Sequence, residues 1–255
     1  MALELVTIPC LKDNYAYLIH DAASGETALV DAPEAAPILA ALAARGWRLG
    51  QILITHHHSD HIDGVAEVQA ATGARVFGGE ADRHRLPKLD RGLREGDTVM
   101  VGGETGQVID VSGHTLGHIA YHFPDSGYAF TADSLMAGGC GRLFEGAPAM
   151  MWASLSKLAA LPDATLICSG HEYTASNLRF AATIEPGNTA LQARIARVAG
   201  ARENGEATVP SLLSVEMATN PFLRAGLPQV KALVGMPGAS DAAVFAEIRA
   251  RKDKF

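Results

Sequence analysis

Four histidines and one aspartate fall within the seven-residue segment Thr55-His-His-His-Ser-Asp-His61. The segment directly follows the apolar run 51–54, which is typical of a buried strand, and loops at strand ends are where α/β proteins place chemistry. Alternate side chains of an extended loop point the same way, so His56 and His58 are expected to bind one cation together. Asp60 and His61 follow a turn and are expected to face a second cation.

Further ligand types occur downstream, each after an apolar run that predicts a strand. They are His114, in a glycine-rich segment, Asp133 and His171. Imidazole and carboxylate groups suit borderline cations such as zinc, iron and manganese. Seven ligands are too many for one tetrahedral ion, but they suit two ions that share Asp133 and a water. His57, which points away from its neighbours, and His118 are expected near the site but not as ligands.

Composition narrows the class of protein. Of the 255 residues, 48% are hydrophobic and 19% are charged, which excludes a disordered chain. The formal net charge of −7 disfavours a nucleic-acid partner, and no apolar stretch approaches the ~20 residues of a membrane helix. Three cysteines without a C-x-x-C pair, and a first segment without a basic region, favour a reducing cytoplasm. We expect a cytoplasmic monomer with a small-molecule substrate.

The order of predicted elements indicates a mixed α/β fold. An α/β body extends to about residue 172 and a mostly helical part follows it. Within the body, residues 97–133 favour strands, with a turn at 124–127. Strands are expected at 5–8, 17–20, 27–30, 51–54, 74–77, 119–123 and 128–131, and helices at 35–44, 65–71, 175–184, 190–202 and 241–252.

The histidine pattern resembles the metallo-β-lactamase superfamily, whose hallmark is T-H-x-H-x-D-H followed by a His, an Asp and a His at wide spacing. Over nearly its full length the sequence is similar to glyoxalase II, the hydroxyacylglutathione hydrolases. The metal motif alone specifies only the superfamily, and other segments specify the family. The segments that carry the resemblance are 13–19, 55–61, 113–118, 130–133, 139–146 (Gly-Cys-Gly-Arg-Leu-Phe-Glu-Gly), 170–174 (Gly-His-Glu-Tyr-Thr), 220–224 and 251–255.

The resemblance implies an αββα sandwich over residues 1–172, which carries the metals, and a helical domain over 173–255 that completes a glutathione site. It implies that His56, His58 and His114 hold one metal. It implies that Asp60, His61 and His171 hold the other, with Asp133 bridging the two. By position in the matching segments it assigns glutathione binding to Arg142, Tyr173, Arg249 and Lys252.

The reaction implied is hydrolysis of S-D-lactoylglutathione to D-lactate and glutathione, the second step of methylglyoxal detoxification. The hypothesis is attack by a hydroxide shared between two divalent ions, with zinc favoured and iron or manganese also compatible. Asp60 would ligate its metal and orient the hydroxide, which makes it the catalytic side chain. Arg142, Arg249 and Lys252 would meet the carboxylates of glutathione with charge-assisted contacts.

Three positions depart from the family pattern. Arg142 and Phe144 stand where the family often has Lys and Tyr, so one hydrogen bond to the peptide is expected to be missing. Ala132 replaces the usual Gly before the bridging aspartate, which is expected to tighten that turn without changing a ligand.

Other functions on the same scaffold are weighed against this hypothesis. The nearest rival is an iron-dependent glutathione persulfide dioxygenase, whose relatives generally lack the long helical tail. A β-lactamase or lactonase does not need the basic C-terminal segment. The excess of acidic over basic residues disfavours a nuclease, whose substrate is an anion. The non-enzymatic alternative is a metal-bearing binding module, against which the complete ligand set counts.

Overall fold

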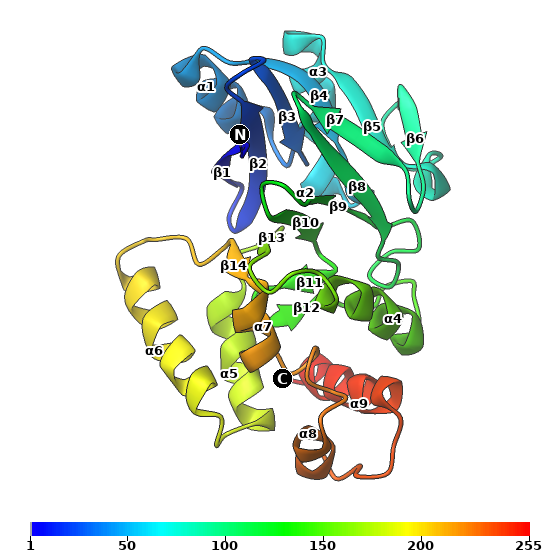
Figure 1. The fold of residues 1–255 in the computed structure, drawn as a ribbon, viewed down its shortest axis with the longest axis vertical. Coiled ribbons are helices and arrows are strands. Elements are labelled where there is room, and N and C mark those ends of the chain that lie inside the picture. The colour runs from blue at the N-terminus through cyan, green and yellow to red at the C-terminus, as the bar shows by residue number, and fades with distance from the viewer. Residues whose placement is uncertain (1) are drawn as a thin grey trace. The chain divides into compact units, whose positions relative to one another are not determined.

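The computed structural model describes residues 2–255, which fall into two compact units. The first unit comprises the chain up to Val111 together with Thr115–Thr131. The second comprises Ser112–His114 and Ala132–Phe255. Figure 1 follows the chain through both units by colour.

The first unit contains two sheets. Its elements are β1 (Glu4–Cys10), β2 (Asn14–Asp21), β3 (Glu26–Val30), α1 (Ala35–Arg45), β4 (Arg48–Leu53), α2 (Ser59–Ile62), α3 (Val65–Thr72), β5 (Arg75–Gly79), the 3₁₀ turn η1 (Glu80–Asp82), β6 (Arg91–Leu93), β7 (Thr98–Val101), β8 (Glu104–Asp110), β9 (Ile119–Phe123) and β10 (Tyr128–Ala132). The first sheet runs β1-β2-β3-β4-β5-β6, and β3 to β6 pair in parallel. The carboxyl ends of β3, β4 and β5 therefore meet at one edge of this sheet.

The second sheet of this unit is antiparallel, with β7, β8, β9 and β10 in chain order. The two sheets pack through aromatic side chains, because Tyr17 of β2 lies edge-on to Phe130 of β10 at 5.5 Å between ring centroids. The opposite face of the first sheet carries α1 and α3. There Leu18 of β2 joins Ile38 and Val68 in one apolar core, as the alternation of side chains along a strand requires.

The second unit is mostly helical. Its elements are β11 (Leu135–Met136), β12 (Gly139–Cys140), α4 (Pro148–Ala159), β13 (Leu166–Ser169), α5 (Thr174–Ile184), α6 (Thr189–Glu203), β14 (Ser211–Leu212), α7 (Leu213–Thr219), α8 (Pro228–Leu233) and α9 (Asp241–Asp253). The strands form two short antiparallel pairs, β11 with β12 and β13 with β14. Side chains cap the first turns of α6 and α9, where Asn188 and Ser240 accept hydrogen bonds from backbone amides.

The secondary structure agrees with the elements expected from the sequence. Every strand and helix predicted there is present, most of them longer by one to three residues at an end. The predicted turn at 124–127 joins β9 to β10, with Gly127 at a positive φ of 72°. Helix α4 was not among the expected elements, although Pro148 at its first turn is a recognised helix start. The domain boundary at residue 172 stays a prediction.

A buried ion pair organises the second unit. Glu216 of α7 is fully buried, and Arg194 of α6 donates to it and, at 2.7 Å, to the hydroxyl of Thr219. Glu216 also accepts hydrogen bonds from the Gly138 amide at 2.7 Å and from Asn220 at 3.2 Å. The carboxylate thereby ties α6 and α7 to the β11–β12 hairpin, which carries Cys140 and leads to Arg142.

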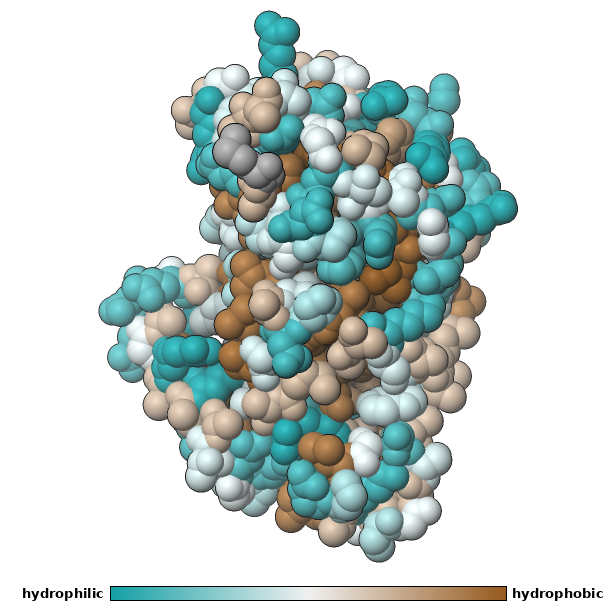
Figure 2. All heavy atoms as spheres, viewed as in Figure 1, coloured by the Kyte–Doolittle hydropathy of each residue, from teal (hydrophilic) through white to brown (hydrophobic). Residues whose placement is uncertain are grey.

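The described surface is mixed in character. Figure 2 shows hydrophilic and hydrophobic residues interspersed on one face. None of the helices within residues 2–255 is both long and apolar enough to cross a membrane. Three large apolar side chains of the second unit are exposed: Phe144 at 61%, Leu233 at 55% and Phe255 at 62%. Packing in the apolar core therefore does not explain why these positions carry apolar residues.

Removing one partner of the buried ion pair tests its contribution to stability. Arg194→Ala leaves the Glu216 carboxylate buried without its cation, and we expect a loss of about 3–5 kcal/mol in the free energy of unfolding. Arg197→Ala on the exposed side of the same helix is the matched control, with an expected change within about 0.5 kcal/mol. Urea unfolding followed by circular dichroism measures both, and equal effects of the two variants would contradict the assignment.

Candidate active site

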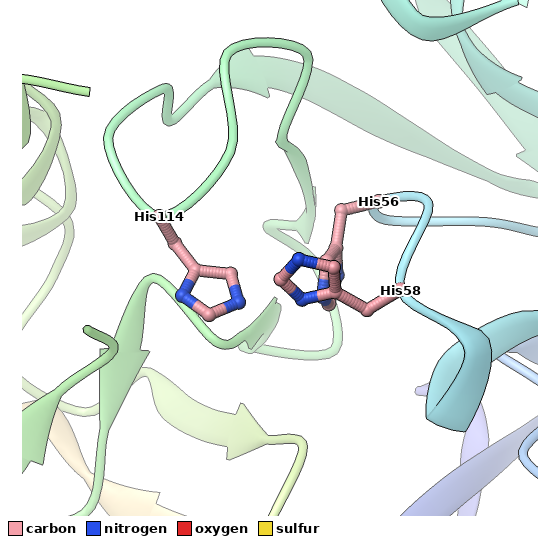
Figure 3. A group of neighbouring side chains, drawn as sticks. All are labelled: His56, His58 and His114. Carbon is pink, nitrogen blue, oxygen red and sulfur yellow. The ribbon is translucent and has the colours of Figure 1, made fainter. Parts of the chain in front are cut away.

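The histidine loop of the first unit brings two imidazoles to one point. The Nε2 atom of His56 lies 3.2 Å from Nδ1 of His58, and the two ring centroids are 4.8 Å apart. Figure 3 shows both rings turned toward each other from the loop that follows β4. The ring of His118 stacks on His56 at 4.6 Å, so His118 packs beside the loop, as expected from the sequence.

Hydrogen bonds indicate which nitrogen of His56 carries the proton. The hydroxyl of Thr55 donates to Asp31 at 2.8 Å, so its oxygen can accept from Nδ1 of His56 at 3.0 Å. That tautomer leaves the lone pair of His56 Nε2 facing His58. A neutral imidazole presented in this way is the form that binds a metal.

Asp31 anchors the same loop from the end of β3. Its carboxylate accepts from the Thr55 amide and from Nδ1 of His61, each at 2.8 Å. Because an ionised carboxylate only accepts, Nδ1 of His61 carries the proton and Nε2 carries the lone pair. Asp31 itself has a φ of 56°, an uncommon backbone conformation that this set of contacts holds in place.

Asp60 is positioned next to His61. Its Oδ2 atom lies 3.9 Å from Nε2 of His61. Asn14 donates to the Asp60 side chain at 3.0 Å and to its carbonyl oxygen at 2.9 Å, which fixes the carboxylate while 41% of the side chain stays exposed. His57 contacts Asp82 at 3.1 Å, and its ring lies edge-on to that of His58 with 4.9 Å between centroids.

The second unit contains its own group of ligand types around Asp133. The Oδ2 atom of this buried aspartate lies 3.5 Å from Nε2 of His114 and 3.3 Å from Nε2 of His171. His114 lies in the loop between β8 and β9 (Figure 3), and its Nδ1 donates to the carbonyl oxygen of Arg142 at 2.7 Å. Both imidazoles therefore offer Nε2 toward one carboxylate oxygen.

Close backbone approaches explain two residue types around this group. A side chain at Gly141 would collide with the Asp133 carbonyl oxygen at 1.9 Å, so only glycine fits there. Gly113, at a φ of 151°, lies against Met151 with the same consequence. Ala132 adopts a φ of 42°, a left-handed conformation that strains a residue with a Cβ, and whether its turn is tighter than one with glycine stays a prediction.

The two groups fit borderline divalent cations by their chemistry. Hydrogen bonds at Nδ1 of His56, His61 and His114 favour the tautomers whose Nε2 carries a lone pair, and nearby carboxylates supply negative charge. Zinc, iron and manganese all accept such donors. The arrangement can therefore activate water and polarise a carbonyl group.

An aromatic ring packs on the ligand group of the second unit, and the basic residues assigned to glutathione lie in the same unit. Tyr173, half-exposed, stacks on His171 with 4.6 Å between centroids and 6° between planes. Arg142 is largely exposed and lies 3.9 Å from Asp253. Arg249 is buried on α9 and donates to the Cys140 carbonyl oxygen at 3.1 Å, and Lys252 lies one turn farther along the helix.

Comparisons with known proteins decide the family. Residues 172–255 match the model described as hydroxyacylglutathione hydrolase C-terminus, and residues 12–171 match that of the metallo-β-lactamase superfamily. A hydroxyacylglutathione hydrolase of Fuscovulum blasticum is 69% identical over 255 residues, covering 100% of both chains. The chain belongs to the hydroxyacylglutathione hydrolase family. The resemblance stated from the sequence is confirmed.

Solved structures agree on the fold of this family member. The B3 metallo-β-lactamase BLEG-1 superposes with a TM-score of 0.68 at 21% identity, over 86% of this chain and 99% of that one. The protein TTHA1623, in a di-iron-bound form, gives a TM-score of 0.56 at 30% identity over 66% of this chain and 91% of its own. The expected metallo-β-lactamase fold with a helical C-terminal part is confirmed, and its histidine and aspartate groups support divalent metal binding. The ligand and glutathione assignments stay predictions.

Asp31 is the residue that the sequence reasoning missed. It follows the predicted strand 27–30. Asp133 was selected because it also follows a predicted strand, so the same criterion could have found Asp31. Asp253 and Phe255 were also missed as neighbours of the basic residues. Their contacts depend on how α9 packs, which no local pattern reports.

Asp31→Asn tests the anchoring role. Asparagine tolerates the same backbone conformation, but an amide nitrogen facing Nδ1 of His61 would favour the other tautomer and protonate Nε2. We expect metal affinity to fall about 10- to 100-fold, measured by competition with a chromophoric chelator. Asp63→Asn, an exposed carboxylate on the same loop, is the control and should bind metal like the wild type. Unchanged affinity in Asp31→Asn would refute the role.

Proposed function

We propose that this chain hydrolyses S-D-lactoylglutathione to D-lactate and glutathione. The observation that carries the proposal is the 69% identity over the whole chain to a hydroxyacylglutathione hydrolase, with the family's C-terminal segment present at residues 172–255. The chemistry of the site supports it, because imidazoles and carboxylates of the metal-binding type occur beside cations that suit an anionic thioester.

We further propose the metal assignment that the resemblance implies. His56, His58 and His114 hold one divalent ion, and Asp60, His61 and His171 hold the other, with Asp133 bridging. Two observations support this: His56 and His58 converge within the first unit, and His114 and His171 converge on Asp133 within the second. Zinc is favoured, and iron or manganese suits the same donors.

The metal ions and the side chains would have different roles in the reaction. Bound divalent cations lower the pKa of water toward neutrality and polarise the thioester carbonyl. Asp60, held by Asn14 and exposed on its other side, is placed to orient the attacking water. A glutathione thiol, with a pKa of about 8.5, leaves as thiolate near neutral pH, so no side chain has to donate a proton to it.

Recognition of glutathione rests on charge. The tripeptide carries two carboxylates and one ammonium group, so it is anionic at neutral pH. On a chain of net charge −7, Arg142, Arg249 and Lys252 supply local positive charge for it. Tyr173 offers its phenol as a further contact. Phe144 has no hydroxyl, so one hydrogen bond that a tyrosine would make is lost there.

A cytoplasmic location and a monomeric state complete the proposal. Cys10, Cys140 and Cys168 are all free, as a reducing compartment favours. Fractionation of cells followed by light scattering of the purified protein tests both, and a periplasmic or oligomeric protein would contradict them.

Thioester hydrolysis and oxygen uptake together separate the two main functions. Purified protein is assayed with S-D-lactoylglutathione by loss of thioester absorbance, and with glutathione persulfide in an oxygen electrode. We expect rapid hydrolysis and no oxygen uptake. Oxygen consumption without hydrolysis would replace the proposed function with the persulfide dioxygenase.

Charge removal on α9 tests the glutathione assignment. In the double variant Arg249→Gln, Lys252→Gln we expect KM to rise about 100-fold, since each charge-assisted contact contributes roughly 1.5 kcal/mol or more. The change in kcat should be far smaller, because both contacts lie remote from the reacting carbon. Arg251→Gln removes an exposed charge from the same helix and should leave KM unchanged. A double variant with the wild-type KM would eliminate the assignment.

A further inference from the structure

A cluster of four phenylalanines lies under the basic residues of α9. Phe180 of α5 stacks on Phe222 at 6.1 Å between centroids, and Phe222 packs against Phe245 at 5.7 Å. Phe255, just beyond α9, meets Phe180 at 5.6 Å. The guanidinium of Arg249 lies 5.1 Å from the Phe222 centroid, so this cluster faces at least one of the proposed glutathione-binding cations.

Lys252 lies between two of these rings. Its ammonium nitrogen is 5.3 Å from the centroid of Phe180 and 5.2 Å from that of Phe255. Both distances fall within the roughly 6 Å over which a cation is attracted to the face of an aromatic ring. No carboxylate forms an ion pair with Lys252 among residues 2–255, so the two rings are the contacts that hold its ammonium group.

The two rings differ in what else they do. Phe180 is fully buried and belongs to the core of the unit. Phe255 is 62% exposed, so burial of apolar surface gives little reason for a phenyl ring at this position. Its defined contacts are the edge of Phe180 and the ammonium of Lys252.

Charged groups around Lys252 also act on its ammonium. Burial, together with the positive charges of Arg249 and Arg179, lowers the pKa of Lys252, while Cys140 and Asp253 act in the opposite direction. Asp253 is itself bound to Arg249 at 2.8 Å. The two guanidinium groups repel the Lys252 ammonium, so the two aromatic rings add an attraction that favours its position between them.

We propose that Phe255 is a positioning residue for glutathione binding, whose ring holds the Lys252 ammonium in place for a carboxylate of the substrate. The inference rests on the proposed function, since it takes Lys252 as a glutathione contact. The ring acts through Lys252 and touches no reacting atom, so it contributes to KM and leaves kcat unaffected.

Three variants separate the ring's charge interaction from its bulk. Phe255→Leu keeps an apolar side chain and removes the aromatic face, and Phe255→Tyr keeps the face. Leu233→Ala removes an exposed apolar side chain from another helix of the same unit and is the control. We expect Phe255→Leu to raise KM for S-D-lactoylglutathione about two- to five-fold at unchanged kcat, and the other two to match the wild type.

The competing outcomes overturn the inference. A wild-type KM in Phe255→Leu, an equal rise in Phe255→Tyr, or a parallel fall in kcat would each show that the aromatic face does not position Lys252. Calorimetric titration with glutathione keeps the test independent of turnover. If the wild type fails to hydrolyse the thioester but binds glutathione, the proposed function fails, and weaker binding in Phe255→Leu alone still supports the inference. If the wild type binds no glutathione, the inference falls as well.

Discussion

The Asp31 carboxylate is the contact on which the metal-binding loop depends. It accepts hydrogen bonds from the backbone and hydroxyl of Thr55 and from the ring of His61. These bonds are available only because β3 and β4 are parallel neighbours, which places their carboxyl ends at one edge. Through Thr55 the same carboxylate determines the tautomer of His56. One anion thus sets both the path of the loop and the nitrogens that it presents.

The part of the second unit that is proposed to bind glutathione depends on a comparable arrangement. Glu216 and Asn220 bind the backbone of the β11–β12 hairpin, and Asn220 donates to the Gly139 carbonyl oxygen at 2.9 Å. The next residue, Cys140, in turn accepts from Arg249 at 3.1 Å. A buried polar network is specific only when its members are satisfied. This one joins the helices that pack the unit to the cation that is proposed to bind glutathione.

Much of this architecture is predictable because local patterns carry it. The segment 55–61 combines a strand end with metal-ligand spacing, so both its position and its chemistry follow from the sequence. The long helices α5, α6 and α9 also follow, since their periodic apolar residues and the N-caps of α6 and α9 are local features. Membership of the family could be predicted from the sequence because several separate segments of the chain match the family pattern.

The rest depends on packing between segments far apart in the sequence. Asp31 and Asp21 both follow apolar runs, and only the partners that surround Asp31 distinguish it. Arg249 and Lys252 resemble a solvated helix face in sequence, yet Arg249 is buried against Cys140 and Phe222. Phe255 has no sequence pattern that would reveal its proposed role, because the ring of Phe180 on α5 meets it only after folding.

The central claim is that two divalent cations act together in thioester hydrolysis. Metal-free protein, prepared with a chelator, should be titrated with Zn²⁺, and with Fe²⁺ and Mn²⁺ in parallel, while turnover of S-D-lactoylglutathione is recorded. The account predicts no turnover without metal and a rise that reaches its plateau at about two equivalents per chain. A plateau at one equivalent, or full activity in the metal-free protein, would contradict it.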